Sequence, residues 1–436
     1  MTAGIDRAPL TFEQHDVYLR AGQTGGYDNV GISYEISGRL EVARLVSALR
    51  EVVERHDALA VRVVSEGGSA HQEWEPPTAD ARIVELREVR ADDREQFARY
   101  VGLTYAADLN DRLGTGAAGN FRFRLLRLRE DHHALLLTFG HLVVDGTGLF
   151  LIERELARIL AHRAPASESV SFLAAARRQR ARVTPGMLDE NSSWWRSVLR
   201  RYPSSRCFPE SGSSMPVLGD SATLSEALRD DPLRRLRAAA ASRRMSMAQL
   251  VIATFAESLL AVSGSERICL WTFADSRRKA DRGTVGMFAG LVPLMLDRAA
   301  GHSIADQVRR ETLAASAHAH MEPRRKFDVF ETLFDSARAD GGRVFDILVN
   351  YIPARAVSSA PGVGGDLRVR SGHFHPPHDG AGWLPAALSL EIVESAPRLD
   401  IRLSYRPSSI AESHARDILA GAIRRLCPSG TAVGRG

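Results

Sequence analysis

Cysteine is scarce in this sequence, and the few cysteines present do not form pairs. The 436 residues include only Cys207, Cys269 and Cys427, and no two of them have the CxxC spacing. This excludes the disulfide frameworks of small secreted proteins and zinc sites built from thiolates. The spacing is typical of a protein from a reducing compartment, and we expect Cys269 to lie in the core.

Lysine is scarcer still, and nearly all the basic residues are arginine. Lys279 and Lys326 are the only lysines, and 57 basic against 53 acidic residues give a formal net charge of +4. The basic residues alternate with acidic ones along most predicted helices and lack the interleaved aromatic residues of single-strand binders. We therefore expect no nucleic-acid partner, although a local basic patch could receive an acidic protein.

Long apolar runs are absent as well. No stretch approaches the ~20 apolar residues that a membrane-spanning helix needs. Near the N-terminus, Asp6, Glu13 and Asp16 interrupt any apolar core of a signal peptide. No GxGxxG turn follows a predicted strand, which argues against a dinucleotide-binding fold. We expect a cytoplasmic, monomeric protein without a membrane partner.

The composition that remains is ordinary for a globular protein, with 44% hydrophobic and 25% charged residues. Helical and strand periodicities alternate without a strict βαβ order, which predicts an α/β fold with mixed sheets. Prolines, serines and arginines cluster between the two halves. We divide the chain into an N-terminal subdomain at 1–165, a connector at 166–220 and a C-terminal subdomain at 221–436.

Local patterns predict several elements within these parts. Apolar residues at helical spacing predict helices at 40–54, 92–107, 172–182 and 232–244. Ser246 and Gln249 have the spacing of a capping box that opens a further helix ending at Gly264. Strands are predicted at 58–64, 83–86, 267–274, 344–351, 388–395 and 399–405.

The stretch 121–161 predicts a hairpin, a loop and a helix. Residues 121–129 alternate apolar and basic side chains, and 134–139 form an apolar run suited to a strand buried on both faces. Leu149, Ile152 and Leu156 then recur at helical spacing from about Gly148. The intervening loop, 140–146, is the place where we expect chemistry.

His141 is the candidate for that chemistry because an imidazole can exchange a proton near neutral pH. It could take a proton from an attacking amine, hydroxyl or thiol and return it to a leaving group. The alternative from spacing alone is a structural histidine, with Asp145 serving only as a helix N-cap.

A second histidine cluster raises the possibility of a metal site. His373, His375, His378 and Asp379 are dense in nitrogen and oxygen donors. Pro377 stands where a metallo-hydrolase pattern needs an aspartate, and no second ligand group is evident. We therefore expect no metal and interpret 373–379 as a loop stiffened by proline.

Several segments resemble the condensation domains of nonribosomal peptide synthetases, which belong to the wider HxxxD acyltransferase superfamily with chloramphenicol acetyltransferase. Residues 141–146 resemble the HHxxxDG signature, and four further segments resemble family elements in the same order along the chain. These are 9–14 (PLTFEQ) for pLTxxQ, 55–63 (RHDALAVRV) for RHExLRTRF, 285–293 (VGMFAGLVP) for vGxFvNtlP and 345–351 (FDILVNY) for fdvlfNY.

The resemblance implies two chloramphenicol-acetyltransferase-like subdomains in a V-shaped arrangement with a central tunnel. It makes His141 the catalytic residue and Asp145, with Gly146, a structural part of the site, where an arginine pairs with the carboxylate. Arg62 and Arg277 are the candidates for that arginine. Strand and loop position alone adds a set of expected tunnel residues: Gly140, Thr147, Asn350, Tyr351 and Ser404.

The implied reaction joins an acyl or aminoacyl thioester to an amine or hydroxyl in natural-product biosynthesis. The donor would be held on the phosphopantetheine arm of an acyl or peptidyl carrier protein, with no bound cofactor. The acceptor would be a small molecule or a second carrier-bound group. No adenylation or carrier segment is recognisable, so we expect a free-standing enzyme.

Two departures from the family pattern keep an alternative open. Gly140 replaces the first histidine of HHxxxDG, and Gly290 replaces the asparagine of GxFvN. The alternative is an inactive module that binds carrier proteins or recruits a partner. For Gly140 itself we expect extra room for a bulky substrate, because a strand glycine costs stability unless space or an unusual φ is needed.

Overall fold

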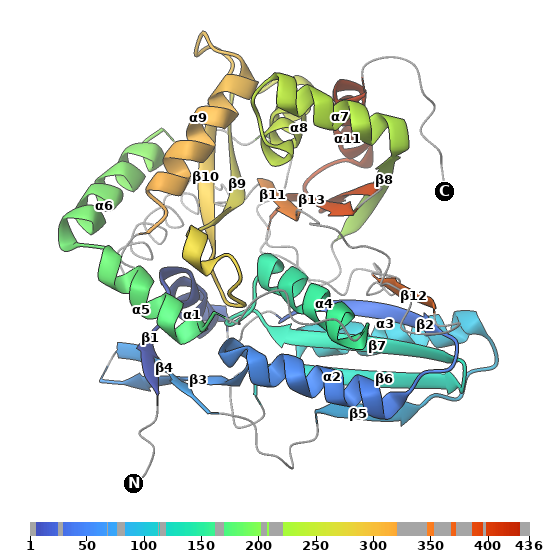
Figure 1. Ribbon diagram of the computed structural model, residues 1–436. Helices are drawn as coiled ribbons and strands as arrows, with labels where there is room; N and C mark the ends of the chain where they lie inside the picture. Colours follow the sequence, from blue (N-terminus) through green and yellow to red (C-terminus); the bar gives the residue numbers. More distant parts are fainter. Residues whose placement is uncertain are drawn as a thin grey trace. The chain divides into compact units, whose positions relative to one another are not determined.

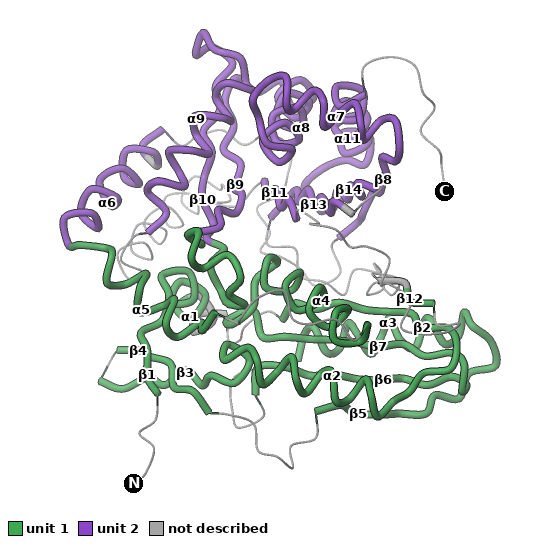
Figure 2. The backbone as a smooth tube through the Cα atoms, in the orientation of Figure 1, with its two compact units in different colours: residues 1–184, 277–289, 357–377 green, residues 185–276, 290–356, 378–436 purple. Residues whose placement is uncertain are grey.

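The chain forms two compact units, which we describe separately. The computed structural model describes residues 6–24, 29–67, 69–75, 83–111, 113, 119–161, 170–201, 207–208, 221–320, 347–352, 368–371, 386–395 and 398–427. Unit 1 comprises residues 1–184, 277–289 and 357–377, and unit 2 comprises 185–276, 290–356 and 378–436 (Figure 2). The contiguous division predicted from the sequence did not include the two segments that return to unit 1.

Unit 1 is built on a five-stranded sheet of order β12-β2-β7-β6-β5 (Figure 1). Its strands are β2 (Asn29–Ser37), β5 (Val84–Glu88), β6 (Phe121–Arg129), β7 (His132–Gly140) and β12 (Arg368–Ser371). β6 and β7 form the predicted antiparallel hairpin, and β5 runs parallel to β6. Every residue of β7 is buried, as its apolar run predicts.

Helices cover both faces of this sheet. They are α2 (Val42–Arg55) and α4 (Gly146–Leu160) on one face and α3 (Arg94–Asn110) on the other. Leu45, Leu49 and Val52 of α2 pack in the cluster that also holds Phe123 and Leu137. Because side chains alternate along a strand, a second cluster forms beneath α3 from the remaining apolar residues.

The rest of unit 1 lies around a three-stranded sheet of order β1-β4-β3. These strands are β1 (Arg7–Pro9), β3 (Val61–Glu66) and β4 (Ser69–Trp74), with helices α1 (Phe12–Thr24) and α5 (Phe172–Arg182) and the 3-10 turns η1 (Asp57–Ala60) and η2 (Lys279–Asp281). Helix α5 has the predicted bounds. Helix α1 was not predicted.

Unit 2 has a six-stranded mixed sheet of order β10-β9-β11-β13-β14-β8. Its strands are β8 (Ala222–Arg229), β9 (Arg267–Asp275), β10 (Ala289–Asp297), β11 (Ile347–Ile352), β13 (Leu388–Ser395) and β14 (Arg398–Tyr405). Its described helices are α6 (Pro185–Leu199), α7 (Asp230–Ser242), α8 (Met247–Ser263), α9 (Ile304–Ala317) and α11 (Glu412–Leu426).

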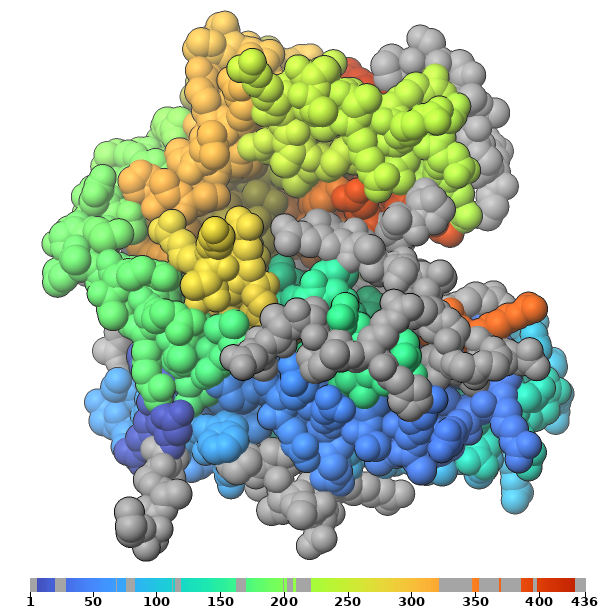
Figure 3. All heavy atoms as spheres, viewed as in Figure 1, coloured from blue at the N-terminus to red at the C-terminus, as the bar shows by residue number. Residues whose placement is uncertain are grey.

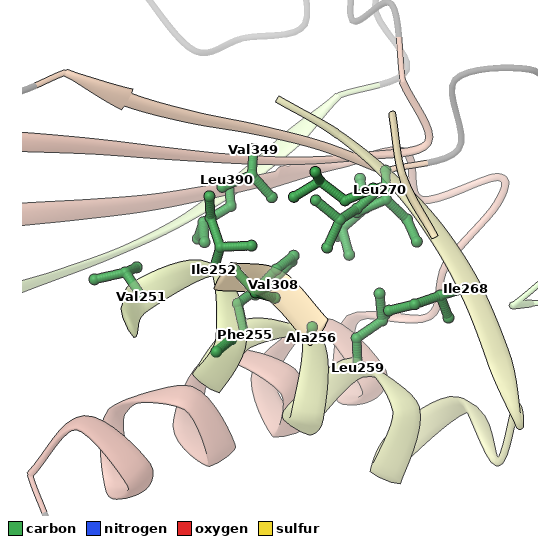
Figure 4. Close-up of a cluster of buried hydrophobic side chains, with 14 of the residues drawn as sticks. Val251, Ile252, Phe255, Ala256, Leu259, Ile268, Leu270, Val308, Val349 and Leu390 are labelled. Atoms are coloured by element: carbon green, nitrogen blue, oxygen red, sulfur yellow. The ribbon is translucent and has the colours of Figure 1, made fainter. Parts of the chain in front are cut away.

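Helix α8 forms the centre of the unit 2 core. Its apolar residues, including Ile252 and Phe255, pack against strand residues such as Leu270 and Val349 (Figure 4). The predicted capping box of Ser246 and Gln249 opens this helix, and Gly264 ends it in the left-handed conformation with φ 66°. Both ends of α8 are therefore set by local sequence.

Candidate active site

The loop after β7 turns tightly within unit 1. The backbone N–H groups of Val143 and Val144 donate to the carbonyl of Gly140, at 3.0 and 3.2 Å. Leu142, Val143 and Val144 are buried. Asp145 N donates to Gly286 O at 3.2 Å and anchors the end of the loop. The loop backbone is thus fixed at both ends.

His141 is half-buried and has a defined orientation. Its Nδ1 lies 2.9 Å from the carbonyl oxygen of Val144. Because a carbonyl oxygen only accepts hydrogen bonds, Nδ1 must carry the hydrogen. The neutral ring then has its lone pair on Nε2, which is the form that can accept a proton from an attacking group.

Asp145 is both a helix cap and half of an ion pair. Its Oδ1 accepts from Gly148 N at 2.8 Å and from Arg277 Nη2 at 2.8 Å. Its Oδ2 accepts from Arg277 Nη1 at 2.7 Å and from Phe288 N at 2.9 Å. A carboxylate has about four acceptor positions, so all are used inside the protein. Asp145 therefore holds the loop and α4.

Arg277 also forms hydrogen bonds through all three of its guanidinium nitrogens. It donates through Nη2 to Gly286 O at 2.9 Å and through Nε to Thr284 O at 3.2 Å. Its guanidinium also lies over the ring of Phe288, 4.5 Å from the centroid. The Arg277 and Asp145 side chains are only 2% and 1% exposed. The pair ties residues 277–288 to the loop that carries His141.

Arg62, the other candidate for this pairing, lies elsewhere in unit 1. It contacts Glu73 at 2.7 Å and Glu75 at 3.4 Å, and its side chain is 49% exposed. Expecting it beside Asp145 was wrong, because Arg62 lies directly opposite Glu73 of β4 and pairs with that carboxylate across the strands.

Gly286 belongs to the site because there is no space for a side chain at this position, a requirement that the sequence alone did not reveal. A Cβ at this position would lie 2.3 Å from Cδ2 of Phe172. Phe172 begins α5 and packs edge-on against Phe288, with ring centroids 5.5 Å apart. The glycine lets residues 285–288 lie against α5. The only signal in the sequence that pointed to this glycine was the match of VGMF to the family element.

The glycines around the loop differ in how closely they are packed. A Cβ at Gly148 would meet Val144 Cγ1 at 3.2 Å, whereas one at Gly146 would meet nothing within 4 Å. A Cβ at Gly140 would lie at ordinary contact, 3.7 Å from Leu113 and from Asn120. It would point toward these buried residues of unit 1, which gives no support to the expected extra room for substrate.

The RHD segment at 55–57 supports the site through contacts with helices α4 and α5. His56 Nε2 lies 2.6 Å from Glu155 Oε2 of α4, and Arg55 pairs with the same carboxylate. Burial raises the pKa of Glu155, but these partners outweigh it and lower that pKa below the usual value. Asp57 accepts from Phe172 N at 2.8 Å and Leu173 N at 3.2 Å, at the N-terminus of α5.

The expected tunnel residues fall in both units. Thr147 lies in the first turn of α4 in unit 1, and Asn350, Tyr351 and Ser404 lie in unit 2. Successive strand residues face opposite sides, so Asn350 and Tyr351 cannot both line one wall. The prediction from strand position did not distinguish the faces that these two side chains take.

The two faces of the unit 2 sheet divide these three residues. Tyr351 packs against the α8 core and donates to Glu394 Oε2 at 2.7 Å. Burial and this hydrogen bond raise its pKa, so the hydroxyl stays protonated. Ser404 lies 3.0 Å from Thr223 and, by strand register, shares the other face with Asn350. Tyr351 thus makes these contacts within unit 2, and its place in a tunnel stays a prediction.

The remaining sequence predictions concern metals, cysteines and membranes. The cluster at 373–379 lies outside the described residues. Cys207, Cys269 and Cys427 form no disulfide, and Cys269 is buried as expected. No single helix of the described chain is long and apolar enough to cross a membrane. By length and composition alone, α7 and α8 would pass that test together, with a 97° bend between them.

Comparison with known proteins places these observations in a family. Residues 6–359 match the family described as Condensation domain. Malpinin synthetase of Mortierella alpina is 24% identical over 355 residues, which is 75% of this chain and 4% of that protein. Surfactin synthase subunit 2 of Bacillus subtilis is 24% identical over 304 residues, 67% of this chain and 8% of that protein. The chain spans less than a tenth of these relatives.

Solved structures show the same fold. The first condensation domain of the calcium-dependent antibiotic synthetase matches with a TM-score of 0.72 and 18% identity, covering 97% of this chain and 95% of that chain. The starter condensation domain of rhizomide synthetase matches with a TM-score of 0.71 and 19% identity, covering 96% and 93%. The predicted mixed α/β fold of this type is confirmed, while the V-shaped arrangement stays a prediction. The chain belongs to the Condensation domain family.

Proposed function

We propose that this chain is an acyltransferase that moves an acyl or aminoacyl group from a thioester to an amine or hydroxyl. The acceptor nitrogen or oxygen attacks the thioester carbonyl carbon, and a C–N or C–O bond forms. The C–S bond breaks, and the sulfur leaves as a thiol carrying the proton that the acceptor loses. Membership of the Condensation domain family supports amide formation as the primary outcome.

The observation that carries this proposal is the orientation of His141. Its Nδ1 is engaged by Val144 O at 2.9 Å, so Nε2 is the nitrogen left to exchange a proton. For a hydroxyl acceptor, Nε2 removes the proton during attack and returns it to sulfur. For an amine that is already neutral, the ring mainly orients the nucleophile and stabilises the tetrahedral intermediate.

Asp145 has a supporting role in this proposal. All its acceptor positions are used by Gly148, Phe288 and Arg277, so it does not act as the base. It holds the first turn of α4 and the loop in place. None of the hydrogen bonds that hold the His141 and Asp145 side chains needs a side chain at position 140, which favours an active enzyme over a module that only binds carrier proteins.

The proposed donor is presented on the phosphopantetheine arm of a separate carrier protein. The tests therefore supply the carrier in trans. The purified chain is incubated with acyl-loaded carriers and with N-acetylcysteamine thioesters, together with amine and alcohol acceptors. Mass spectrometry should detect amide or ester product with release of one thiol per product. Carrier binding without product across the panel would instead favour the inactive module.

A further inference from the structure

Unit 1 carries a concentrated basic surface on α5 and the adjoining turn η2. We define this basic surface by its five cationic residues: Arg178, Arg182, Arg278, Lys279 and Arg282. All five are exposed. Figure 3 shows residues 277–289, in yellow, forming a continuous surface with the neighbouring green helix.

One buried carboxylate joins the two parts of the basic surface. Asp281 is 2% exposed and lies 2.6 Å from Arg178 and 3.8 Å from Arg182. The guanidinium groups remain 42% and 40% exposed. Among the described residues, no ion pair is formed by Arg278, Lys279 or Arg282. The surface therefore has an excess of four positive charges, as large as the formal net charge of the whole chain.

This surface rests on a rigid support. Asp57 accepts hydrogen bonds at the N-terminus of α5, and Phe172 packs against Phe288 with centroids 5.5 Å apart. Gly286 lies so close to Phe172 that even a Cβ would clash at 2.3 Å. These contacts hold in place the backbone that carries the basic residues, which lowers the entropy cost of binding a partner.

The same segment connects the basic surface to the catalytic loop. Residues 277–288 supply Arg277, Gly286 and Phe288 to Asp145, and η2 lies within this stretch. A partner docked on η2 would therefore contact the segment that fixes the loop of His141. Such a position suits a protein that delivers substrate to this loop.

We propose that this surface docks an acidic face of the carrier protein that presents the acyl thioester. This proposal rests on the proposed function and names the part of the chain that its partner would bind. The aromatic residues of α5 and of residues 277–289 are Phe172 and Phe288, and both are buried, so no base could stack on them. This favours a protein over single-stranded nucleic acid. Complementary charge of this kind mainly speeds encounter, by about 10- to 1,000-fold.

The test compares two triple variants of equal charge. The first carries Arg278→Glu, Lys279→Glu and Arg282→Glu, which lie on the basic surface and whose side chains form no hydrogen bond or ion pair with the described residues of the catalytic loop. The control carries Arg39→Glu, Arg90→Glu and Arg99→Glu, which are exposed elsewhere in unit 1. The substrates are an acyl-loaded, phosphopantetheinylated carrier protein with an acidic surface and the same acyl group on N-acetylcysteamine.

The first variant should raise KM for the carrier-bound substrate about tenfold or more at low salt, with the difference shrinking as salt is added. Turnover of the N-acetylcysteamine thioester should be unchanged, and the control variant should resemble the wild type. The proposal is overturned if the KM for the carrier-bound substrate does not change or if the control variant shows the same rise in KM. It is also overturned if turnover of both substrates falls together.

A binding measurement separates this proposal from the proposed function. If the wild type turns over neither substrate, the proposed function fails, and fluorescence anisotropy of the labelled carrier then tests docking alone. Weaker binding in the first variant but not in the control supports the surface. Equal binding of the carrier by all three proteins overturns the proposal. It is also overturned if the wild type binds a DNA duplex more tightly than it binds the carrier and the first variant loses this DNA binding.

Discussion

Asp145 and His141 lie in the same loop but need different surroundings for their roles. His141 needs one ring nitrogen available, whereas Asp145 uses every acceptor position internally. The sequence pattern could place both in one loop but left Asp145 as either a cap or an ion-pair partner. The structure shows that it is both, because the N-terminus of α4 and residues 277–288 meet at one carboxylate.

Asp145→Ala should destabilise the protein by about 3–5 kcal/mol, because it leaves the buried charge of Arg277 without its partner. Urea unfolding and the yield of soluble protein would measure this. Arg62→Ala is the matched control, since Arg62 is half-exposed and should contribute at most about 1 kcal/mol. A stable but inactive Asp145→Ala protein would point to a direct catalytic role and contradict our assignment.

Gly286→Ala should be destabilising by about 1–3 kcal/mol, because its methyl group would overlap Phe172 at 2.3 Å. Gly140→Ala should change stability by no more than about 1 kcal/mol, because its Cβ would find ordinary contacts at 3.7 Å. Thermal unfolding of the two variants distinguishes them. Equal losses would mean that the packing of α5 against residues 285–288 is looser than described.

At the level of elements, helix α5 is the link between the RHD segment and the site. Asp57 accepts hydrogen bonds from its N-terminus, and its first residue, Phe172, packs on Phe288. The N-cap residue of α5 is Ser171, and Asp57 adds hydrogen bonds from the N–H groups of Phe172 and Leu173. Asp57→Ala should cost about 1 kcal/mol, as for other lost hydrogen bonds at a helix N-terminus, and should also lower kcat/KM because α5 supports residues 285–288.

The control for this variant lies in α3. Asp93 caps that helix by accepting from Gln96 N at 2.8 Å, and among the described residues no side-chain hydrogen bond or ion pair joins α3 to residues 141–146. Asp93→Ala should cost similar stability while leaving kcat/KM unchanged. If both variants lose activity equally, the effect of Asp57 is general destabilisation and α5 is not a support of the site.

Local periodicity predicted the elements whose ends are set by local sequence. The hairpin of β6 and β7, the bounds of α5 and the capping box of α8 all follow from residues close in the chain. The pairing of Arg277 with Asp145 joins residues 132 positions apart, and only the family resemblance suggested it. The face taken by Tyr351 could not be predicted, because strand alternation gives two faces without saying which one the helices cover.

At the scale of the whole molecule, a buried histidine should make the protein sensitive to acid. Burial, together with the nearby charges of Arg127 and His132, lowers the pKa of His133 to about 4. The unfolded chain binds this proton near pH 6.5, so stability is full above that pH and falls as pH drops toward 4. The loss should reach about 3 kcal/mol.

Urea midpoints at pH 7, 5.5 and 4.5 would test this dependence. His133→Leu should flatten the loss, and exposed His302→Gln should leave it as in the wild type. A wild-type midpoint that stays constant across this range would show that His133 accepts its proton in the folded state at an ordinary pH.

The central claim is that His141 promotes acyl transfer by this chain. The most direct measurement is single-turnover transfer from an acyl thioester to an amine or alcohol, for the wild type and for His141→Ala at matched fold stability. With a hydroxyl acceptor, where proton removal contributes most, the variant should react about 100-fold or more slower than the wild type. Transfer at the wild-type rate by a folded His141→Ala protein would contradict the account.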